Sequence, residues 1–193
     1  MPSTRRLWTA LGAVMLISFS LLGWLGREIY QQAPPIPDAV RTTDGRIVFG
    51  PGSITEGQQV WQSMGGHQLG SIWGHGSYVA PDWTADWLHR EALAILDRHA
   101  LARYGSDYAS LDAARQAALQ AELQSNTYDP ERKVLTVSAE RAAAIEEVKA
   151  HYLSLFSNAP ETARLRERYA IKNNAVPDPA RREALAAFIF WSA

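Results

Sequence analysis

Histidines and glycines gather in one passage of the sequence, "GGHQLGSIWGHGSYVAPDWTADWLHREA", residues 65–92. His67, His75 and His89 are the side chains of this passage that could bind a metal ion. Their spacings of eight and fourteen residues match no compact ligand motif such as H-E-x-x-H. We therefore favour the simpler interpretation, in which they are surface or hydrogen-bonded residues of a loop.

The same passage holds carboxylates and aromatic rings. The carboxylates lie at the start of one expected helix, where negative charge favours the positive end of the helix dipole without any acid–base role: Asp82, Asp86 and Glu91. The indoles could stack on a sugar, but buried core packing is the commoner use of such rings: Trp73, Trp83 and Trp87. Nucleophile-elbow, phosphate-loop and dinucleotide-binding patterns are absent. These residues alone do not define an enzyme.

Composition narrows the class of protein. A chain of 193 residues, 47% hydrophobic, can bury one modest core, so we expect one domain plus attachments. Lys and Arg number 19 against 20 Asp and Glu, a balance that does not favour nucleic acid as a partner. The cysteine count of 0 excludes disulfides, thiolate metal sites, a cysteine nucleophile and covalent c-type haem.

An apolar run near the N-terminus predicts a membrane anchor. Leu7–Gly26 is a stretch of twenty uncharged residues, the length of a transmembrane helix. Trp8 and Trp24 lie near its ends, where indoles suit the membrane interface. Arg5 and Arg6 precede it, which places the N-terminus in the cytoplasm. A cleaved signal peptide would have a shorter apolar core and a small-x-small site, so we predict a retained anchor.

Beyond the anchor the sequence predicts a mainly helical chain. A Pro-rich linker comes first, and short strands are expected at residues 46–50 and 133–137. A capping-box pattern, Thr55 with Gln58, predicts the start of the first helix. Further helices are expected after the caps Asp82 and Ser138, with Gly105 ending the former, and at residues 110–124 and 160–169.

The last segment admits two interpretations. Asp178 and Pro179 form a cap and first turn, and the ten residues from Ala184 are uncharged and increasingly apolar. Either this helix packs into the domain, or it is the first half of a second transmembrane helix, since ten residues cover only about 15 Å. We favour the second transmembrane helix.

The run "GQQVWQSMGGHQLGSIWGHGSYVAPDWTADWLHREA" resembles the N-terminal region of bacterial quinol-dependent, single-chain nitric oxide reductases. The resemblance extends to the order of parts: an anchor helix, a Pro-rich spacer, this loop and the following helix. It implies a cytochrome c-like extramembrane domain fused to a membrane domain of the haem–copper oxidase type.

The resemblance also bears on haem. The related two-subunit enzymes have a cytochrome c subunit with C-x-x-C-H, followed shortly by G-x-G-x-Y-x-A-P-[DE]. The second pattern is reproduced here by Gly74, Gly76, Tyr78, Ala80, Pro81 and Asp82. Where the two cysteines and the histidine would stand, this sequence has Gly66, Leu69 and Gly70. The resemblance therefore implies a cytochrome c-like domain that binds no haem c.

A calcium contact is implied by the same resemblance. In the family, the glycine carbonyl and the tyrosine of G-x-Y reach toward a Ca²⁺ ion, and Gly76 and Tyr78 match these positions. Hard Ca²⁺ takes carbonyl and other oxygen ligands, and glycine permits close approach of the backbone. The alternative stays open that Gly76 is a turn residue and Tyr78 packs at a domain interface.

Taken together, we predict the N-terminal fragment of a nitric oxide reductase of the bacterial inner membrane, with a periplasmic globular part and no catalytic residue of its own. The missing catalytic membrane domain, holding haem b, haem b3 and non-haem iron, and a quinol donor are the implied partners; the oligomeric state is left open. The expected parts are a cytoplasmic N-terminus (1–6), a transmembrane helix (7–26), a linker (27–40), the haem-free domain (41–178) and the start of the second transmembrane helix (179–193).

The alternative function is a free-standing membrane-anchored periplasmic binding or sensor module. Its ligand surface would be the tryptophan-rich loop. Histidine-bearing apolar helices encoded after Ala193 would favour the reductase over this alternative.

Overall fold

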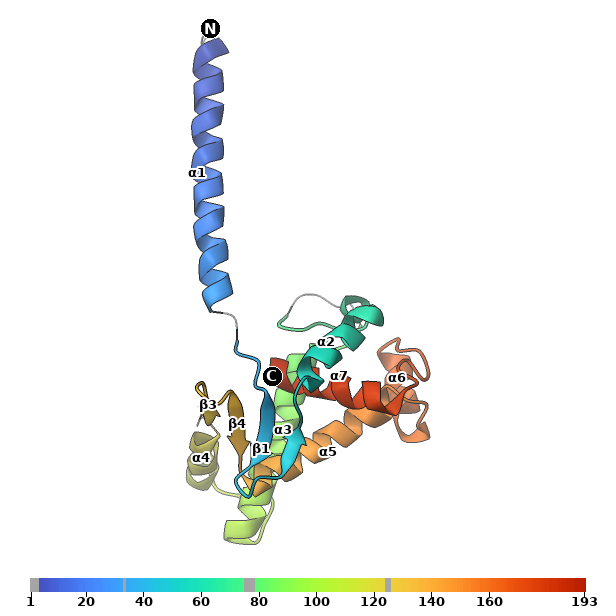
Figure 1. Cartoon of the computed structure of the whole chain (residues 1–193). Coiled ribbons are helices and arrows are strands. Elements are labelled where there is room, and N and C mark those ends of the chain that lie inside the picture. Colours follow the sequence, from blue (N-terminus) through green and yellow to red (C-terminus); the bar gives the residue numbers. More distant parts are fainter. Residues whose placement is uncertain (1–3, 33, 75–78, 124–125) are drawn as a thin grey trace. The chain divides into compact units, whose positions relative to one another are not determined.

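The computed structural model describes residues 4–32, 34–74, 79–123 and 126–193. The chain divides into two compact units, Met1–Pro35 and Ile36–Ala193 (Figure 1). Each unit is described by itself below.

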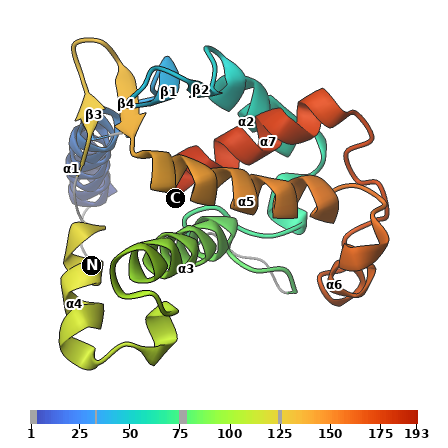
Figure 2. The same cartoon turned by 90° about the horizontal axis from the view of Figure 1, so that it is seen from below.

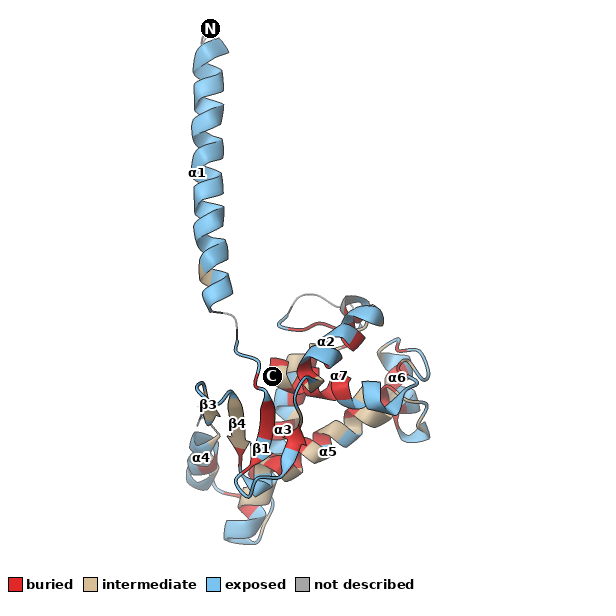
Figure 3. Ribbon diagram, viewed as in Figure 1, coloured by how far each residue is buried: buried red, intermediate tan, exposed pale blue. Residues whose placement is uncertain are grey.

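The first unit is built on a single helix, α1 (Thr4–Gln31), which extends beyond the predicted span at both ends. None of its residues is buried, although most of them are apolar (Figure 3). Among the described residues it is the one helix long and apolar enough to cross a membrane. Exposed apolar surface of this extent is costly in water, so the helix suits the predicted membrane anchor.

The second unit contains a small mixed sheet of order β2-β1-β4-β3. Strand β1 (Ala39–Thr42) pairs antiparallel with β2 (Ile47–Phe49) and parallel with β4 (Val134–Val137), which pairs antiparallel with β3 (Tyr128–Asp129). Strands β2 and β4 confirm the two predicted strands. Strand β1 lies partly in the predicted Pro-rich linker. It was not predicted, because its pairing partner β4 comes almost a hundred residues later in the chain.

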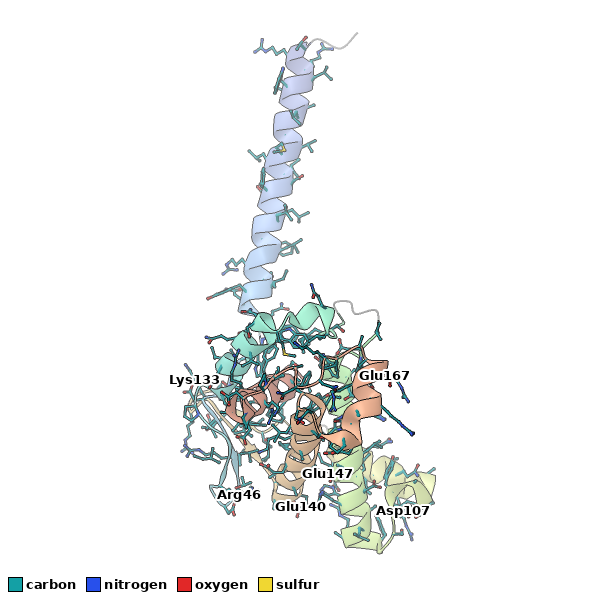
Figure 4. All side chains as sticks on the ribbon, turned by 90° about the vertical axis from the view of Figure 1, so that its right-hand side faces the viewer. Arg46, Asp107, Lys133, Glu140, Glu147 and Glu167 are labelled. Atoms are coloured by element: carbon teal, nitrogen blue, oxygen red, sulfur yellow. The ribbon has the colours of Figure 1, made fainter. Side chains whose placement is uncertain are left out.

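Helices form the rest of this unit. Their bounds are α2 (Ser53–Ser63), α3 (Trp83–Tyr104), α4 (Ala113–Glu122), α5 (Ala139–Leu155), α6 (Ala163–Arg168) and α7 (Pro179–Ser192), with 3₁₀ turns at Gly66–Gln68, Tyr108–Ser110 and Pro160–Thr162. Figure 2 shows α5 lying beside both α3 and α7, and these three helices pack on one another. The charged residues labelled in Figure 4 are exposed, whereas Glu91 and Arg166 are buried.

Local capping signals account for several of the helix ends. Asp82 accepts a hydrogen bond from the Ala85 N–H, and Ser138 and Asp178 cap α5 and α7 in the same way, as predicted. Gly105 ends α3 in the left-handed conformation, with φ 68°. The predicted start of α2 at Thr55 was wrong. The helix begins at Ser53 after Gly52, whose φ of 79° lets the chain turn into the helix without a side-chain cap.

Helix α7 is part of the core of this unit. Residues 184–190 are all buried, and α7 packs on α2, α3 and α5 (Figure 3). The crossing with α2 is so close that a Cβ on Gly57 would lie 1.9 Å from the Ala184 carbonyl oxygen. This is the first of the two sequence interpretations: packing within the domain accounts for the apolar run. The run therefore does not by itself indicate a membrane span, and the second transmembrane helix remains a prediction.

Candidate functional site

The loop between α2 and α3 holds the passage that the sequence singled out. Backbone hydrogen bonds close its base: the Ser71 N–H donates to the Pro81 carbonyl oxygen (3.2 Å), and the Trp83 N–H donates to the Ser71 carbonyl oxygen (2.8 Å). Ser71 and Asp82 thereby form an isolated parallel bridge. Ser71, in the middle of the loop, is thereby fixed beside its last residue, Asp82, at the start of α3.

Asp82 holds this base together. Its carboxylate accepts hydrogen bonds from the Ser71 hydroxyl (2.8 Å), the Ala85 N–H (3.0 Å) and the Gly74 N–H. Partial burial acts to raise the pKa of Asp82, but the hydrogen bonds from Ala85, Ser71 and Gly74 outweigh it and lower the pKa. Asp82 is therefore an ionised structural group, which caps α3 and ties down the loop.

Two glycines of the loop lie directly under indole rings. A Cβ on Gly66 would be 2.1 Å from Cε2 of Trp61, and a Cβ on Gly70 would be 2.0 Å from Nε1 of Trp83. Gly70 also has φ 142°, which disfavours other residues. The resemblance places haem-attachment residues at these two positions. Since the chain has no cysteine and neither position has room for a side chain, this segment does not fit a covalently attached haem c.

An aromatic cluster fills the interior next to the loop. Trp83 meets Tyr152, Phe156 and Tyr169 edge-on, with ring centroids 6.0, 5.7 and 5.9 Å away. Trp87 stacks on Tyr152 at 5.1 Å. Both indoles are fully buried, at 0% exposure, so the core role favoured for Trp83 and Trp87 is confirmed.

Trp73 differs from the other two tryptophans of the passage. It is 49% exposed and has φ 56°, an uncommon conformation for a residue other than glycine. Its Nε1–H donates to the Ser192 carbonyl oxygen (2.9 Å), and its ring meets that of Trp191 edge-on at 5.6 Å. The loop is thus joined to the last turn of α7. Since Trp73 lies at the surface and Trp83 and Trp87 are buried, these three indoles do not form a stacked aromatic platform.

Two acidic groups of α3 are held by partners in the interior, and the first of them is the half-buried Asp86. Its Oδ2 accepts hydrogen bonds from the Tyr152 hydroxyl (2.8 Å) and from Nε of Arg90 (2.8 Å). Burial, together with the neighbouring Asp86 charge, raises the pKa of Tyr152 well above its usual value. Tyr152 therefore stays protonated and serves as a hydrogen-bond donor in the core.

The second is Glu91, whose side chain is 6% exposed. One carboxylate oxygen accepts from Nε1 of Trp87 (2.7 Å), and the other accepts from Nε of Arg141 on α5 (2.7 Å). From the sequence we predicted only that Asp86 and Glu91 lie near the start of a helix. We missed Tyr152 and Arg141 because both lie fifty or more residues away on α5. Both carboxylates form hydrogen bonds with core residues, so a structural role explains their positions and no catalytic proton transfer is needed.

The candidate metal ligands are not brought together by the described part of the chain. His89 is exposed on α3, in agreement with the favoured interpretation, while His75 and the side chain of His67 lie outside the described residues. Gly76 and Tyr78 also lie outside them, so the calcium contact stays a prediction. Within the described ranges, no group of three or more His, Asp or Glu side chains is arranged to hold a metal ion.

These features describe a mainly helical domain whose loop does not fit a covalently attached haem, in a chain that also has an apolar N-terminal helix. Residues 37–193 match the family of the NorB cytochrome c-like domain of nitric oxide reductase, and the chain belongs to this family. No curated protein matches the sequence. The family assignment supports the predicted relation to nitric oxide reductase and favours it over a free-standing sensor module.

Proposed function

We propose that this chain is the N-terminal part of a quinol-oxidising nitric oxide reductase of the bacterial inner membrane. The parent reaction converts two molecules of nitric oxide, two electrons and two protons to nitrous oxide and water. The family match over residues 37–193 and the apolar helix α1 support this proposal. In it, α1 anchors the chain with its N-terminus in the cytoplasm, and the globular part faces the periplasm.

The main support for the proposal comes from the loop between α2 and α3, where indole rings occupy the space beside the two positions that would attach haem. Trp61 covers Gly66 and Trp83 covers Gly70, in a chain without cysteine. A domain built this way does not carry electrons through haem c from a soluble donor. Electrons must then enter the enzyme elsewhere, and a quinol that delivers them directly to the membrane domain meets this requirement.

The role of the domain itself would be to cap the catalytic membrane domain. Trp73 and Val79, 49% and 57% exposed, flank the part of the loop that contains Gly76 and Tyr78. Exposed apolar side chains on both sides of a loop favour contact with another surface. We propose that this loop contacts the membrane domain, with Gly76 and Tyr78 contributing oxygen ligands to a shared Ca²⁺ ion.

The electron donor provides the main test. The reductase that contains this chain, purified from membranes, is supplied either with a reduced quinol or with a reduced soluble cytochrome c, and nitric oxide consumption is measured with an electrode. We expect consumption with the quinol only, and a haem spectrum without a c-type band. Turnover with cytochrome c, or a covalently bound c-type haem, would contradict the proposal.

The calcium contact is tested separately. Tyr78→Phe removes a hydroxyl but keeps the ring, and Tyr104→Phe, at an exposed position of α3, is the matched control. We expect the bound calcium of the purified reductase, measured by elemental analysis, to fall in Tyr78→Phe and to stay unchanged in Tyr104→Phe. Equal calcium in both variants would rule out Tyr78 as a ligand.

A further inference from the structure

A cavity of about 510 Å³ lies between α3, the end of α4, strand β4 and the start of α5. This volume is in the range of natural small-molecule sites. Apolar side chains make up much of its lining: Leu88, Ala92, Ile95, Ala121, Leu123 and Val137.

The cavity lies between two separate cores. Val137 belongs to the main core, while Leu123 packs against a smaller one formed by Leu96, Ala100, Leu111 and Leu119. At the rim, Arg103 on α3 binds Glu122 on α4 through two hydrogen bonds of 2.6 and 2.7 Å. Because α4 is fixed to α3 by its own small core and by this ion pair, the space beside β4 is held open.

Arg141 provides the guanidinium donor of a lining that also contains the imidazole of His99 and the hydroxyl groups of Thr127, Thr136 and Ser138. The Nε of Arg141 is committed to Glu91, and the same carboxylate is held by Nε1 of Trp87, so the guanidinium is oriented by a buried partner. Arg141 lines the cavity and its side chain is 35% exposed. Within the described part of the chain, its two Nη groups have no hydrogen-bond partner. They are available to an oxygen acceptor placed among the apolar side chains.

The charges of the lining compensate one another. Glu91 pairs with Arg141, and Glu122 pairs with Arg103 and also lies 3.6 Å from Nδ1 of His99, so each cationic group of the lining faces a carboxylate. An anion would have to give up its hydration in an apolar cavity without meeting a net positive charge, which is unfavourable. A neutral molecule with a carbonyl oxygen meets no such cost and can still accept from Arg141.

We propose that this cavity is a binding site for a neutral, ring-sized apolar molecule whose carbonyl oxygen accepts hydrogen bonds from Arg141. The site is independent of the loop between α2 and α3 and of the proposed electron donor. The domain would then bind a ligand in addition to the quinol that we propose for the membrane domain.

The probe for the test is 6-propionyl-2-(dimethylamino)naphthalene, a neutral aryl ketone whose emission shifts to the blue in apolar surroundings. It is titrated into the full chain at a fixed detergent concentration, and the signal of detergent alone is subtracted. We expect saturable binding of one molecule per chain. Absence of a saturable component would overturn the proposal.

Matched variants locate the probe. Ala92→Phe fills the cavity, whereas Ala94→Phe makes the same change on the other side of α3, outside the lining. We expect Ala92→Phe to abolish saturable binding and Ala94→Phe to leave it unchanged. Arg141→Lys keeps a positive charge beside Glu91 but loses the planar donors, and binding should weaken about three- to tenfold. Melting followed by circular dichroism confirms that each variant is folded. Equal effects of the two phenylalanines would refute the location.

The charge argument is tested by competition. 2-Acetonaphthone and 2-naphthoate share the same ring system and differ in carrying a neutral ketone or a carboxylate. We expect the ketone to displace the probe more effectively than the carboxylate. Stronger competition by the carboxylate would refute the assignment of a neutral ligand.

Discussion

The crossing of α2 and α7 yields a quantitative test of the fold. Gly57→Ala adds one methyl group, which would lie 1.9 Å from the carbonyl oxygen of Ala184 and 2.7 Å from the Cβ of Phe188. Ordinary contact distances are about 3.5 Å or more. The first of these atoms belongs to the backbone of α7, so no side-chain rotation can relieve the overlap, and α7 must shift by roughly 1.5 Å.

The magnitude follows from two opposing contributions. Alanine is better than glycine inside a helix by about 1 kcal/mol. Overpacking of a close-packed core costs about 1–3 kcal/mol, and the cost lies at the upper end or above when backbone must move. We therefore expect a net loss of about 2 kcal/mol in the free energy of unfolding. For a domain of this size, that lowers the melting temperature by roughly 4–8 °C.

The assay is thermal unfolding of the full chain in detergent, followed by the near-ultraviolet circular dichroism of its aromatic core. Gly50→Ala is the matched control, because a Cβ on Gly50 meets nothing within 4 Å and its φ is ordinary. We expect the control to melt with the parent chain. If Gly57→Ala melts with the parent chain or above it, α7 does not pack on α2 as described, and the interpretation of its apolar run must return to a membrane helix.

Three further predictions concern the buried charges and the closed loop. Arg141→Ala leaves the Glu91 carboxylate buried without its cation, so we expect a loss of about 3 kcal/mol in the free energy of unfolding by denaturant titration, most of it restored by Arg141→Lys. Gly70→His places a side chain against the ring of Trp83; we expect a lower melting temperature, and an unchanged or higher melting temperature would refute the closure of the loop. Because the pKa of Asp82 is lowered in the folded chain, its ionisation stabilises the fold at neutral pH, and this contribution is lost as the pH falls below about 4 through the folded pKa. Asp82→Ala should therefore cost about 1 kcal/mol at pH 7 and progressively less at low pH in melts across a pH series, and a cost independent of pH would contradict this account.

Signals confined to a few residues were sufficient to predict several helix ends. Asp82, Ser138 and Asp178 cap their helices through hydrogen bonds that span two or three residues, so the sequence contains the whole interaction. Gly105 ends α3 for an equally local reason. The start predicted at Thr55 was wrong because the capping-box pattern is short and matches many segments. The helix begins directly after Gly52, a left-handed glycine three residues earlier.

Features that depend on distant partners could not be predicted. Strand β1 forms because β4 pairs with it, and nothing near Ala39 indicates this. The apolar run of α7 suits both a membrane and a protein core, and only the partner helices decide between them. The site shows the same division. The resemblance located Gly66 and Gly70, whereas the rings that cover them come from Trp61 and Trp83 by tertiary packing.

The closure of the loop also constrains how this domain can evolve. Attaching a haem would require two cysteines and an axial histidine, together with smaller residues in place of Trp61 and Trp83. None of these substitutions yields a bound haem alone, and each one either crowds a closed loop or empties part of a packed core at a cost in stability. Intermediates along such a path would be selected against before any benefit appeared. Single mutations would therefore not convert this closed loop into a haem-attachment site.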